Sequence, residues 1–371
     1  MSRPGPGRRL LAIVIVCLVL PYALSPIYRF PVSRPFTGAY LWNPYEGARG
    51  RWLRANLHAH GRAWGGVTNG QQSDAEVIAA YRAAGYDIAG ISDYQSIATT
   101  DTMPTVPLYE HGFNLGKHHQ LAIGAQSVDW IDFPLWQGVH QKQYVINRLK
   151  QSSALVMLNH PAKLHSYTEE DLARLAGYDL IEVANGQVMA EERWDAALSS
   201  GHAVWGVGAD DTHDVTDPDR TAVAWIMINA DSTSRADLVN ALRAGRSYTV
   251  SRTANTPTAG RLALASAVVK DGTLTLICLG EPATFSFVGQ NGAIRGTVAN
   301  AMSASYTFTP ADTYIRTAVR GTQTVLFLNP VLRSDGFGPA TPVAEVDPIW
   351  TWLLRFTIVA GCAAILWRVR R

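Results

Sequence analysis

The stretch "RANLHAHG", residues 54–61, places His58 and His60 one residue apart, directly after a short run that is typical of a β-strand. Alternate side chains of a strand point to the same face, so both imidazoles would face one space. Paired imidazoles on one face commonly hold a divalent metal ion. An isolated pair of this kind is more often two polar residues near a strand end, so the rest of the chain has to decide between the two interpretations.

Outward from this stretch, residues 51–252 alternate amphipathic runs with short apolar ones. The apolar runs are rich in β-branched residues, as in parallel sheets that are buried on both faces. Repeated units of this kind predict a parallel α/β barrel or an open doubly wound sheet. The expected helix and strand pairs are 74–86 with 87–94, 141–153 with 154–161, 168–178 with 179–186, and 193–202 with 203–214.

The pattern changes after residue 252. Residues 253–335 form short alternating runs separated by Gly, Asn and Asp, which predicts a small antiparallel β-sandwich-like domain. Segments 26–50 and 336–348 show no period and are expected to be linkers.

Polar side chains recur where the expected strands end. They are His58, His60, Asp93, Gln126, His160, Glu182, Asn185, Asp210, Asp211 and His213. Each one alone has a structural explanation, such as a helix cap or a solvated turn. Together they form a set of nitrogen and oxygen donors that suits Zn, Mn or Fe, and the C-terminal strand ends are where barrel active sites form.

A family resemblance becomes specific at this point. The segments "ANLHAHG", "YDIAGISDY", "LNHPAK", "IEVANG" and "GVGADDTHD" resemble, in order and spacing, the motifs of the polymerase and histidinol phosphatase (PHP) superfamily. The resemblance covers about residues 51–252 and is to a membrane-associated branch with a C-terminal β-rich domain. It implies a distorted (β/α)7 TIM-like barrel and a cluster of up to three divalent metal ions that hydrolyses phosphate esters.

The resemblance also implies roles for individual residues. The expected metal ligands are His58, His60, Asp93, Gln126, His160, Asp211 and His213. Asp210 or His213 is expected to act as general base or to orient the base.

Three positions depart from the family pattern. Tyr94 stands where the family has a histidine, Gln126 stands where a bridging glutamate is expected, and "GRAWGGVTNG" lacks the acidic residue or histidine that usually follows the first motif. A glutamine offers one neutral carbonyl oxygen and cannot neutralise the charge between two cations. We therefore expect fewer ions than a complete cluster. His118, His119 and His140 in the intervening loops would either repair the site or lie at the surface.

The sequence therefore predicts a metal-dependent hydrolase of phosphomonoester or phosphodiester bonds. Its substrate would be a phosphorylated small molecule, a lipid head group or a cell-envelope component. The alternative is a degenerate domain that binds an anionic ligand or a partner without turnover. A net charge of +2 argues against a general nucleic-acid binder, and three cysteines are too few for a disulfide framework.

Both termini are apolar. Residues 10–24 follow three arginines within the first nine residues, which predicts a signal anchor over residues 1–25. Residues 349–367 fit one membrane crossing, and the basic tail at 368–371 follows them. We expect a membrane protein with both tails in the cytoplasm and residues 26–348 on the other side.

This topology can be tested with reporters fused to the full-length chain. Reporters at both termini should be active only on the cytoplasmic side, and one inserted in segment 26–50 only outside, because the arginine flanks stay with the cytoplasm. A C-terminal reporter that is active outside would contradict the two-span arrangement.

Overall fold

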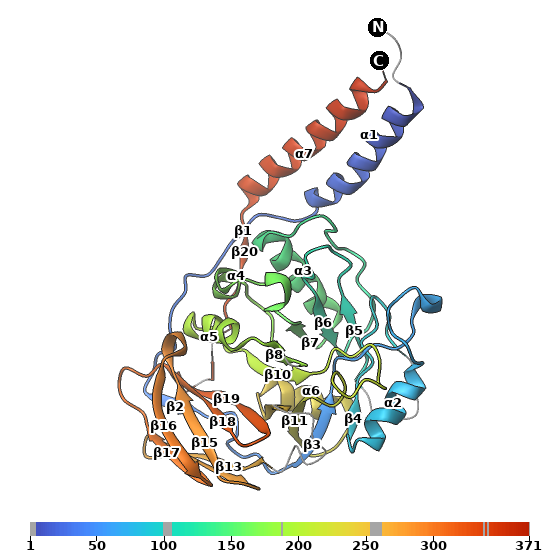
Figure 1. The fold of residues 1–371 in the computed structure, drawn as a ribbon. Coiled ribbons are helices and arrows are strands. Elements are labelled where there is room, and N and C mark those ends of the chain that lie inside the picture. The colour runs from blue at the N-terminus through green and yellow to red at the C-terminus, as the bar shows by residue number, and fades with distance from the viewer. Residues whose placement is uncertain are drawn as a thin grey trace.

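The computed structural model describes residues 5–98, 106–186, 188–252, 262–336, 338–339 and 341–370. The predicted start of the second domain at residue 253 and the last residue of the basic tail lie outside the described residues. The described chain forms a mixed α/β body of two domains, from which two long helices project side by side (Figure 1).

The first domain contains most of the helices. Its strands are β3 (Arg51–Asn56), β4 (Ile88–Ala89), β5 (Leu108–His111), β6 (Gln120–Ile123), β7 (Leu155–Leu158), β8 (Leu180–Asn185), β9 (Val188–Met189), β10 (Trp205–Ala209), β11 (Ala224–Ala230) and β12 (Ser247–Arg252). Its helices are α2 (Asp74–Ala83), α3 (Val139–Ser152), α4 (Glu169–Arg174), α5 (Glu191–Ser199) and α6 (Arg235–Arg243). Capping boxes define two helix starts: the Ser73 side chain accepts from the Glu76 N–H at the start of α2, and the Thr168 side chain accepts from the Asp171 N–H at the start of α4.

The strands of this domain are divided between two sheets. One sheet has the order β10-β8-β7-β6-β5, with β9 paired to β8, and the other contains β3, β4, β11 and β12. β7, β8 and β10 are parallel to one another, whereas β6 is antiparallel to both β5 and β7. Single parallel bridges join the two sheets, from Tyr94 to Glu110 and from Ala59 to Thr212. Of the predicted distorted (β/α)7 TIM-like barrel, the structure shows the mixed α/β character; the described strands form two sheets that meet at two seams through one bridge each, and they do not close into a barrel.

The second domain is antiparallel. Its strands are β13 (Ala263–Lys270), β14 (Thr273–Leu279), β15 (Ala283–Val288), β16 (Ile294–Ala301), β17 (Ser303–Thr307), β18 (Tyr314–Arg320) and β19 (Thr324–Ser334). β13, β14 and β17 form a separate sheet, and its buried residues pack with those of β15, β18 and β19 in one core. β19 also pairs with β12, so one nine-stranded sheet crosses the predicted domain boundary.

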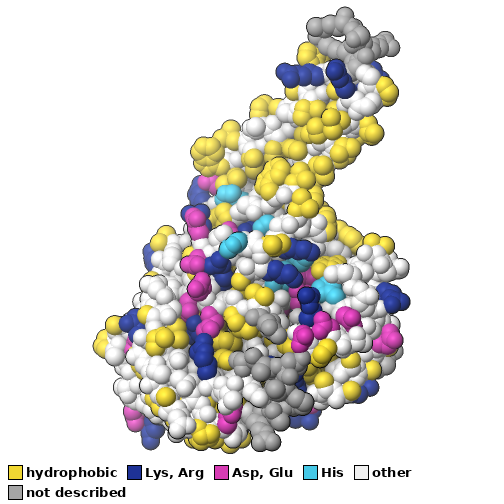
Figure 2. All heavy atoms as spheres, in the orientation of Figure 1, with side chains coloured by type: hydrophobic (Ala, Val, Ile, Leu, Met, Phe, Trp, Pro, Cys, Tyr) yellow, Lys and Arg dark blue, Asp and Glu magenta, His cyan; other side chains and the backbone are white. Residues whose placement is uncertain are grey.

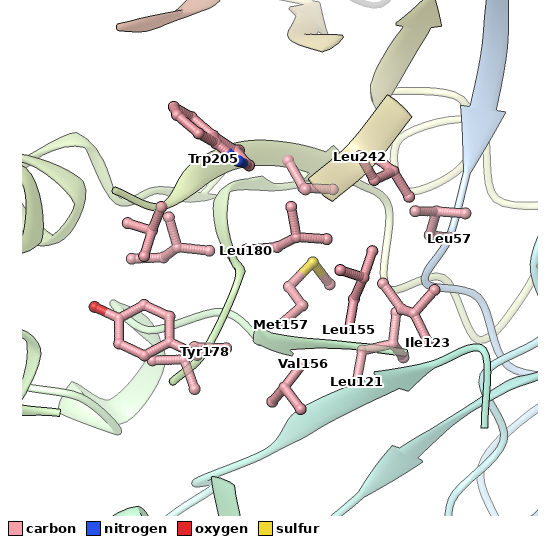
Figure 3. Close-up of a cluster of buried hydrophobic side chains, with 14 of the residues drawn as sticks. Leu57, Leu121, Ile123, Leu155, Val156, Met157, Tyr178, Leu180, Trp205 and Leu242 are labelled. Carbon is pink, nitrogen blue, oxygen red and sulfur yellow. The ribbon is translucent and has the colours of Figure 1, made fainter. Parts of the chain in front are cut away.

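The core of the first domain explains its apolar strands. Side chains of β6, β7, β8 and β10 meet Leu57 and Leu242 in one buried cluster (Figure 3). In β7, Leu155 and Met157 point to one side of the sheet and Val156 to the other, and all three are fully buried (Figure 3). Because both faces of the strand are covered, its sequence is continuously apolar rather than alternating.

The two projecting helices form a stalk. α1 (Pro6–Val19), continued by the short η1 (Leu20–Ala23), lies beside α7 (Pro348–Arg368), and the start of α1 and the end of α7 lie at the far end of the stalk (Figure 1). By length and composition both could cross a membrane, a property that signal sequences share. Arg355, the one charged residue well inside α7, donates to the Ala23 carbonyl at 3.0 Å.

The base of the stalk is fastened by residues from both ends of the chain. β1 (Tyr28–Arg29) pairs with β20 (Glu345–Val346), and Arg29 donates to Asp347 at 2.7 Å. Asp347 also caps the start of α7. β2 (Tyr40–Trp42) pairs with β19. Parts of both predicted linkers are thus strands that attach the stalk to the body.

A buried ion pair joins the two domains. Arg316 of β18 donates to both carboxylate oxygens of Asp195 in α5, at 2.7 and 2.6 Å, and to Glu191 at 2.9 Å. Arg316 and Asp195 are both buried. Burial opposes the charge of Arg316, but Asp195 and Glu191 outweigh it and raise the pKa of the guanidinium.

Replacing Arg316 with Ala should lower the free energy of unfolding by about 3 kcal/mol, because it leaves the buried Asp195 carboxylate without its partner. Arg320→Ala is the matched control. Arg320 pairs with Glu191 at 3.0 Å, but 44% of its side chain is exposed, so its loss should cost less than about 1 kcal/mol. Urea denaturation of the full-length variants measures both, and equal effects would contradict a structural role for the buried pair.

Candidate metal centre

Two backbone segments bring the first group of side chains together. His58 and His60 follow β3 and point to the same side, while Asp211 follows β10. The N–H of Asp211 donates to the His58 carbonyl at 2.9 Å, and the N–H of His60 donates to the Thr212 carbonyl at 2.9 Å. These bonds hold Asp211 at a positive φ of 52°, a conformation that is unusual for a residue other than glycine.

Glu110 of β5 lies between these residues. Its Oε2 is 3.2 Å from His60 Nε2, and its Oε1 is 3.3 Å from His58 Nε2. Asp211 Oδ1 is 3.3 Å from both imidazole nitrogens. All four side chains are at least nine-tenths buried, and their ligand atoms lie within 4.8 Å of one another.

The same carboxylate belongs to a second group. Glu110 Oε1 is 3.0 Å from His119 Nδ1 and 3.3 Å from His160 Nε2. His119 directly precedes β6, and His160 follows β7. Glu110 is therefore shared by two sets of ligand atoms, which is the arrangement of a bridging carboxylate.

Several polar atoms in this cluster make no hydrogen bond. They are His58 Nε2, both ring nitrogens of His60, Glu110 Oε2, Asn159 Oδ1, His160 Nδ1 and Asp211 Oδ1. Buried polar atoms without partners are rare and costly. Nitrogen and carboxylate oxygen atoms that converge in this way fit one or two divalent cations.

Glu182 of β8 holds His58 and His160 through contacts to the His58 ring nitrogen that does not face Glu110 and to the His160 backbone. Its Oε1 is 3.0 Å from His58 Nδ1, and its Oε2 accepts from the His160 N–H at 2.6 Å and from Asn185 at 3.0 Å. A proton on Nδ1 of His58 leaves Nε2 as the free ligand atom. This carboxylate–histidine contact is typical of metal sites.

The electrostatics of the cluster are strongly coupled. Burial opposes a charge on His58, but Asp211, Glu182 and Glu110 outweigh it and raise its pKa well above the usual value. Burial would raise the pKa of Glu110, yet the His119 and His58 imidazoles hold it well below its usual value. The pKa of Asp211 is lowered in the same way, against its burial, first by His58. Glu110 and Asp211 thus favour their charged forms because positive charge lies next to them in the cluster.

The predicted oxygen ligand Gln126 does not join the cluster. β6 is antiparallel to β7, and its last residue Ile123 pairs with Leu155 at the start of β7. Residues that follow β6 therefore leave from the opposite edge of the sheet to His160. Gln126 is exposed there, and its N–H donates to the Ser152 carbonyl at 2.8 Å. A carboxylate that both ligand groups share is supplied by Glu110 instead.

Asp210, which was predicted to act as general base or to orient the base, lies outside the two ligand groups and is held by Tyr81 and the backbone. Its side chain accepts from Tyr81 at 2.8 Å and from three successive backbone N–H groups, those of Ala222, Val223 and Ala224, at 2.8–2.9 Å. Burial raises its pKa despite these bonds. Because both oxygens are engaged with Tyr81 and the backbone, Asp210 secures the approach to β11.

Asp93 also lies outside the two ligand groups. Its Oδ1 accepts from the Gly61 N–H at 2.8 Å and so holds the segment that carries His58 and His60. Burial, followed by the nearby Asp74 charge, raises the pKa of Asp93 to about 6.

His213 and Tyr94 cover His60. The His60 ring stacks on both, with centroids 4.3 Å from His213 and 4.5 Å from Tyr94. His213 Nδ1 is 2.9 Å from the Asp211 carbonyl, and Nε2 is 3.4 Å from the Tyr94 hydroxyl. Burial, followed by the charge of His60, lowers the pKa of His213 to about 4. His213 lies beside the first ligand group, and the two groups do not include it.

The three loop histidines have different positions. His119 belongs to the second ligand group. His118 Nδ1 is 3.1 Å from Asn114 Oδ1, and His140 accepts from the Tyr28 N–H at 3.1 Å near the stalk. Neither lies in the cluster.

Two residues of the site, Glu110 and Lys163, have no recognisable motif in the sequence. Glu110 ends the short apolar run "PLYE", which is the only local signal for β5. Lys163, after β7, donates to Asp211 Oδ2 at 3.1 Å and keeps 43% of its side chain exposed. A cation beside a ligand group at the surface could bind an anionic substrate.

No protein-family model matches the chain, and no curated protein matches it. A solved structure that resembles it is a two-domain protein from Bacteroides vulgatus containing a predicted PHP-like metal-dependent phosphoesterase. The identity is 13% over 85% of this chain and 99% of the other, with a TM-score of 0.43. The assignment of the centre rests on the geometry described above.

Replacing Glu110 with Gln should weaken metal binding by more than the roughly 10- to 100-fold that the loss of an outer partner costs, because both ligand groups lose their shared charge. Gln126→Ala should bind metal as the wild type does. Equilibrium dialysis with elemental analysis of the full-length protein measures both. Loss of metal in Gln126→Ala but not in Glu110→Gln would restore the expectation drawn from the sequence.

Proposed function

We propose that this chain is a membrane-anchored, metal-dependent phosphoesterase of the PHP type, with its main domain outside the cytoplasm. The observation that carries the proposal is the Glu110 carboxylate, which is shared by two buried groups of ligand atoms. The absence of a bridging carboxylate was the strongest argument from the sequence against a working site, and Glu110 removes it.

The strand arrangement supports the same family. β3, β4, β5, β6, β7, β8 and β10 form a ring whose two seams are single bridges, from Tyr94 to Glu110 and from Ala59 to Thr212. We interpret this ring as a strongly distorted (β/α)7 barrel. Its ligand residues His58, His160 and Asp211 follow strands at one end, as in barrel enzymes.

The side chains divide the work of phosphoester hydrolysis. His58, His60, Glu110 and Asp211 would hold one cation, and Glu110, His119 and His160 a second. Zn, Mn or Fe would suit these donors. A bound cation supplies a Lewis acid for the phosphoryl oxygen and lowers the pKa of its water.

His213 is suited to accept a proton. Nδ1 faces the Asp211 carbonyl and donates to it, so Nε2 keeps its lone pair. Lys163 places a partly exposed ammonium group beside Asp211, where it would bind a substrate phosphate oxygen.

One observation favours the alternative, a domain that binds an anionic ligand without turnover. Tyr94 takes a position at which the family has a histidine, and its ring covers His60 at 4.5 Å. The metal groups would then serve binding only. The substrate class in either case is a phosphorylated or anionic molecule, and nucleic acid is not expected from the net charge of +2.

Turnover separates the two functions. The full-length protein, loaded with Mn or Zn, should hydrolyse a generic ester such as bis-p-nitrophenyl phosphate. Asp211→Ala should lose metal and activity together. His213→Ala should keep the metal and lose about 10²- to 10⁴-fold in kcat, because only the proton acceptor is removed.

The control is Gln126→Ala, an exposed site that should match the wild type in metal content and rate. Metal-loaded wild type that binds phosphate but turns over no ester would favour the binding domain. Full activity in metal-free Asp211→Ala would place the chemistry elsewhere.

A further inference from the structure

Most exposed apolar side chains of the first domain lie in loops, and one of these loops contacts the metal centre through Trp64 and Tyr94. Among the described residues from 51 to 252, every exposed large apolar side chain lies in a segment that follows β3, β5, β6, β7 or β8. We call the main members the apolar rim: Trp64, Phe113, Leu115, Trp130, Trp136 and Leu164. Leu115 is 77% exposed and Leu164 is 70% exposed. An exposed apolar surface gathered in one region marks an interaction site.

Contacts connect the rim to the centre at one side. Trp64 donates from Nε1 to the Tyr94 carbonyl at 2.8 Å, and the Tyr94 ring stacks on His60. Trp64 also packs edge-on against Trp130, with ring centroids 5.8 Å apart.

Further contacts connect the rim to the stalk at the other side. The N–H of Leu115 donates to the Pro134 carbonyl at 3.0 Å, in the loop that carries Trp130 and Trp136. Trp136 stacks on Tyr22 of η1 at 4.2 Å, and the Tyr22 hydroxyl donates to the Trp136 carbonyl at 2.9 Å. The rim is therefore continuous with the last turn of the first stalk helix.

Two members of the rim are held in an unfavourable backbone conformation. Trp64 has a φ of 54° and Leu164 a φ of 52°, the left-handed region that side chains larger than glycine avoid. Both side chains are also exposed. Exposure and backbone strain each cost stability, so neither is explained by folding.

Basic residues accompany the apolar ones. Lys163 precedes Leu164, and Lys117 is two residues after Leu115. Figure 2 shows Lys and Arg side chains beside hydrophobic ones and histidines on the part of the body below the stalk. Apolar and aromatic side chains interleaved with lysines are typical of surfaces that lie at the membrane interface, where lysines meet anionic head groups.

We propose that the apolar rim rests on the membrane that holds the stalk, and that the metal centre hydrolyses the phosphorylated head group of a lipid in that membrane. The inference rests on the proposed function and names its substrate class. The stalk argues for a membrane rather than a protein partner, because the rim continues directly into η1 and α1. The rim enters the interface, and the partly exposed Lys163 faces the lipid phosphate.

The test compares one head group in two physical states. The full-length protein is reconstituted in phosphatidylcholine vesicles. In one arm the substrate is long-chain phosphatidic acid or phosphatidylglycerol in the same vesicles. In the other arm it is the dibutyryl form of the same lipid, which stays dissolved. Turnover of the long-chain lipid relative to the dissolved form should fall about tenfold in a Trp130→Ser, Leu115→Ser double variant, because two apolar anchors are lost.

The matched control is Val268→Ser, Ile277→Ser in β13 and β14, which removes two exposed apolar side chains of the second domain. It should keep the wild-type ratio. A rim variant with an unchanged ratio, or a wild type that prefers the dissolved form, would overturn the inference.

A second measurement reads the rim without turnover. Lipids with brominated acyl chains should quench less fluorescence in Trp64→Phe, Trp130→Phe than in the wild type, whereas Trp52→Phe, packed on Tyr248 at 4.8 Å, should not change the quenching. If the protein hydrolyses neither the long-chain lipids nor their dibutyryl forms, the proposed function fails. The quenching measurement then still decides whether the apolar rim contacts lipid. Equal quenching in wild type and rim variant would contradict that contact.

Discussion

The arrangement of the first domain depends on one buried carboxylate surrounded by imidazoles. Glu110 lies within 3.3 Å of four histidines, which come from segments after β3, before β6 and after β7. Burying such a group is unfavourable unless compensating charge converges on it. This requirement explains the bridge between Tyr94 and Glu110, the left-handed Asp211 and the hydrogen bonds that Glu182 makes behind His58. The unfavourable backbone conformation of Asp211 is maintained because its side chain has to lie beside Glu110 and the histidines.

The sequence was informative where a feature is local. Periodicity located α2, α3, α4 and α5 and the strands that follow them, and the spacing of His58 and His60 indicated that both face one space, where the structure has them. Strand direction is not local. The interpretation of Gln126 assumed that every strand before a polar residue runs the same way, but β5 and β6 are antiparallel neighbours. Glu110 is therefore at the end of one strand and His119 at the start of the next, and no helix separates them to signal the reversal.

Contacts between segments that are far apart in the sequence could not be predicted either. Asp210 is next to a ligand residue in the sequence, yet its oxygens face Tyr81 and the backbone before β11, which no short motif reports. The division into two domains follows composition, but β12 and β19 pair across it. The two sheets of the first domain are likewise joined by single bridges at two seams, which no hydrophobic pattern reports.

The strand pair at the stalk base has a consequence for the order in which the molecule is completed. Tyr28 and Arg29 pair with residues more than three hundred positions later in the chain. A contact of such sequence separation forms late, because everything between must first be synthesised and become compact. During synthesis the body is therefore connected to α1 alone, and β1 has no strand partner until β20 has been made. Pairing with β20 and the Arg29–Asp347 contact then fix the orientation of the body relative to the stalk in one final step.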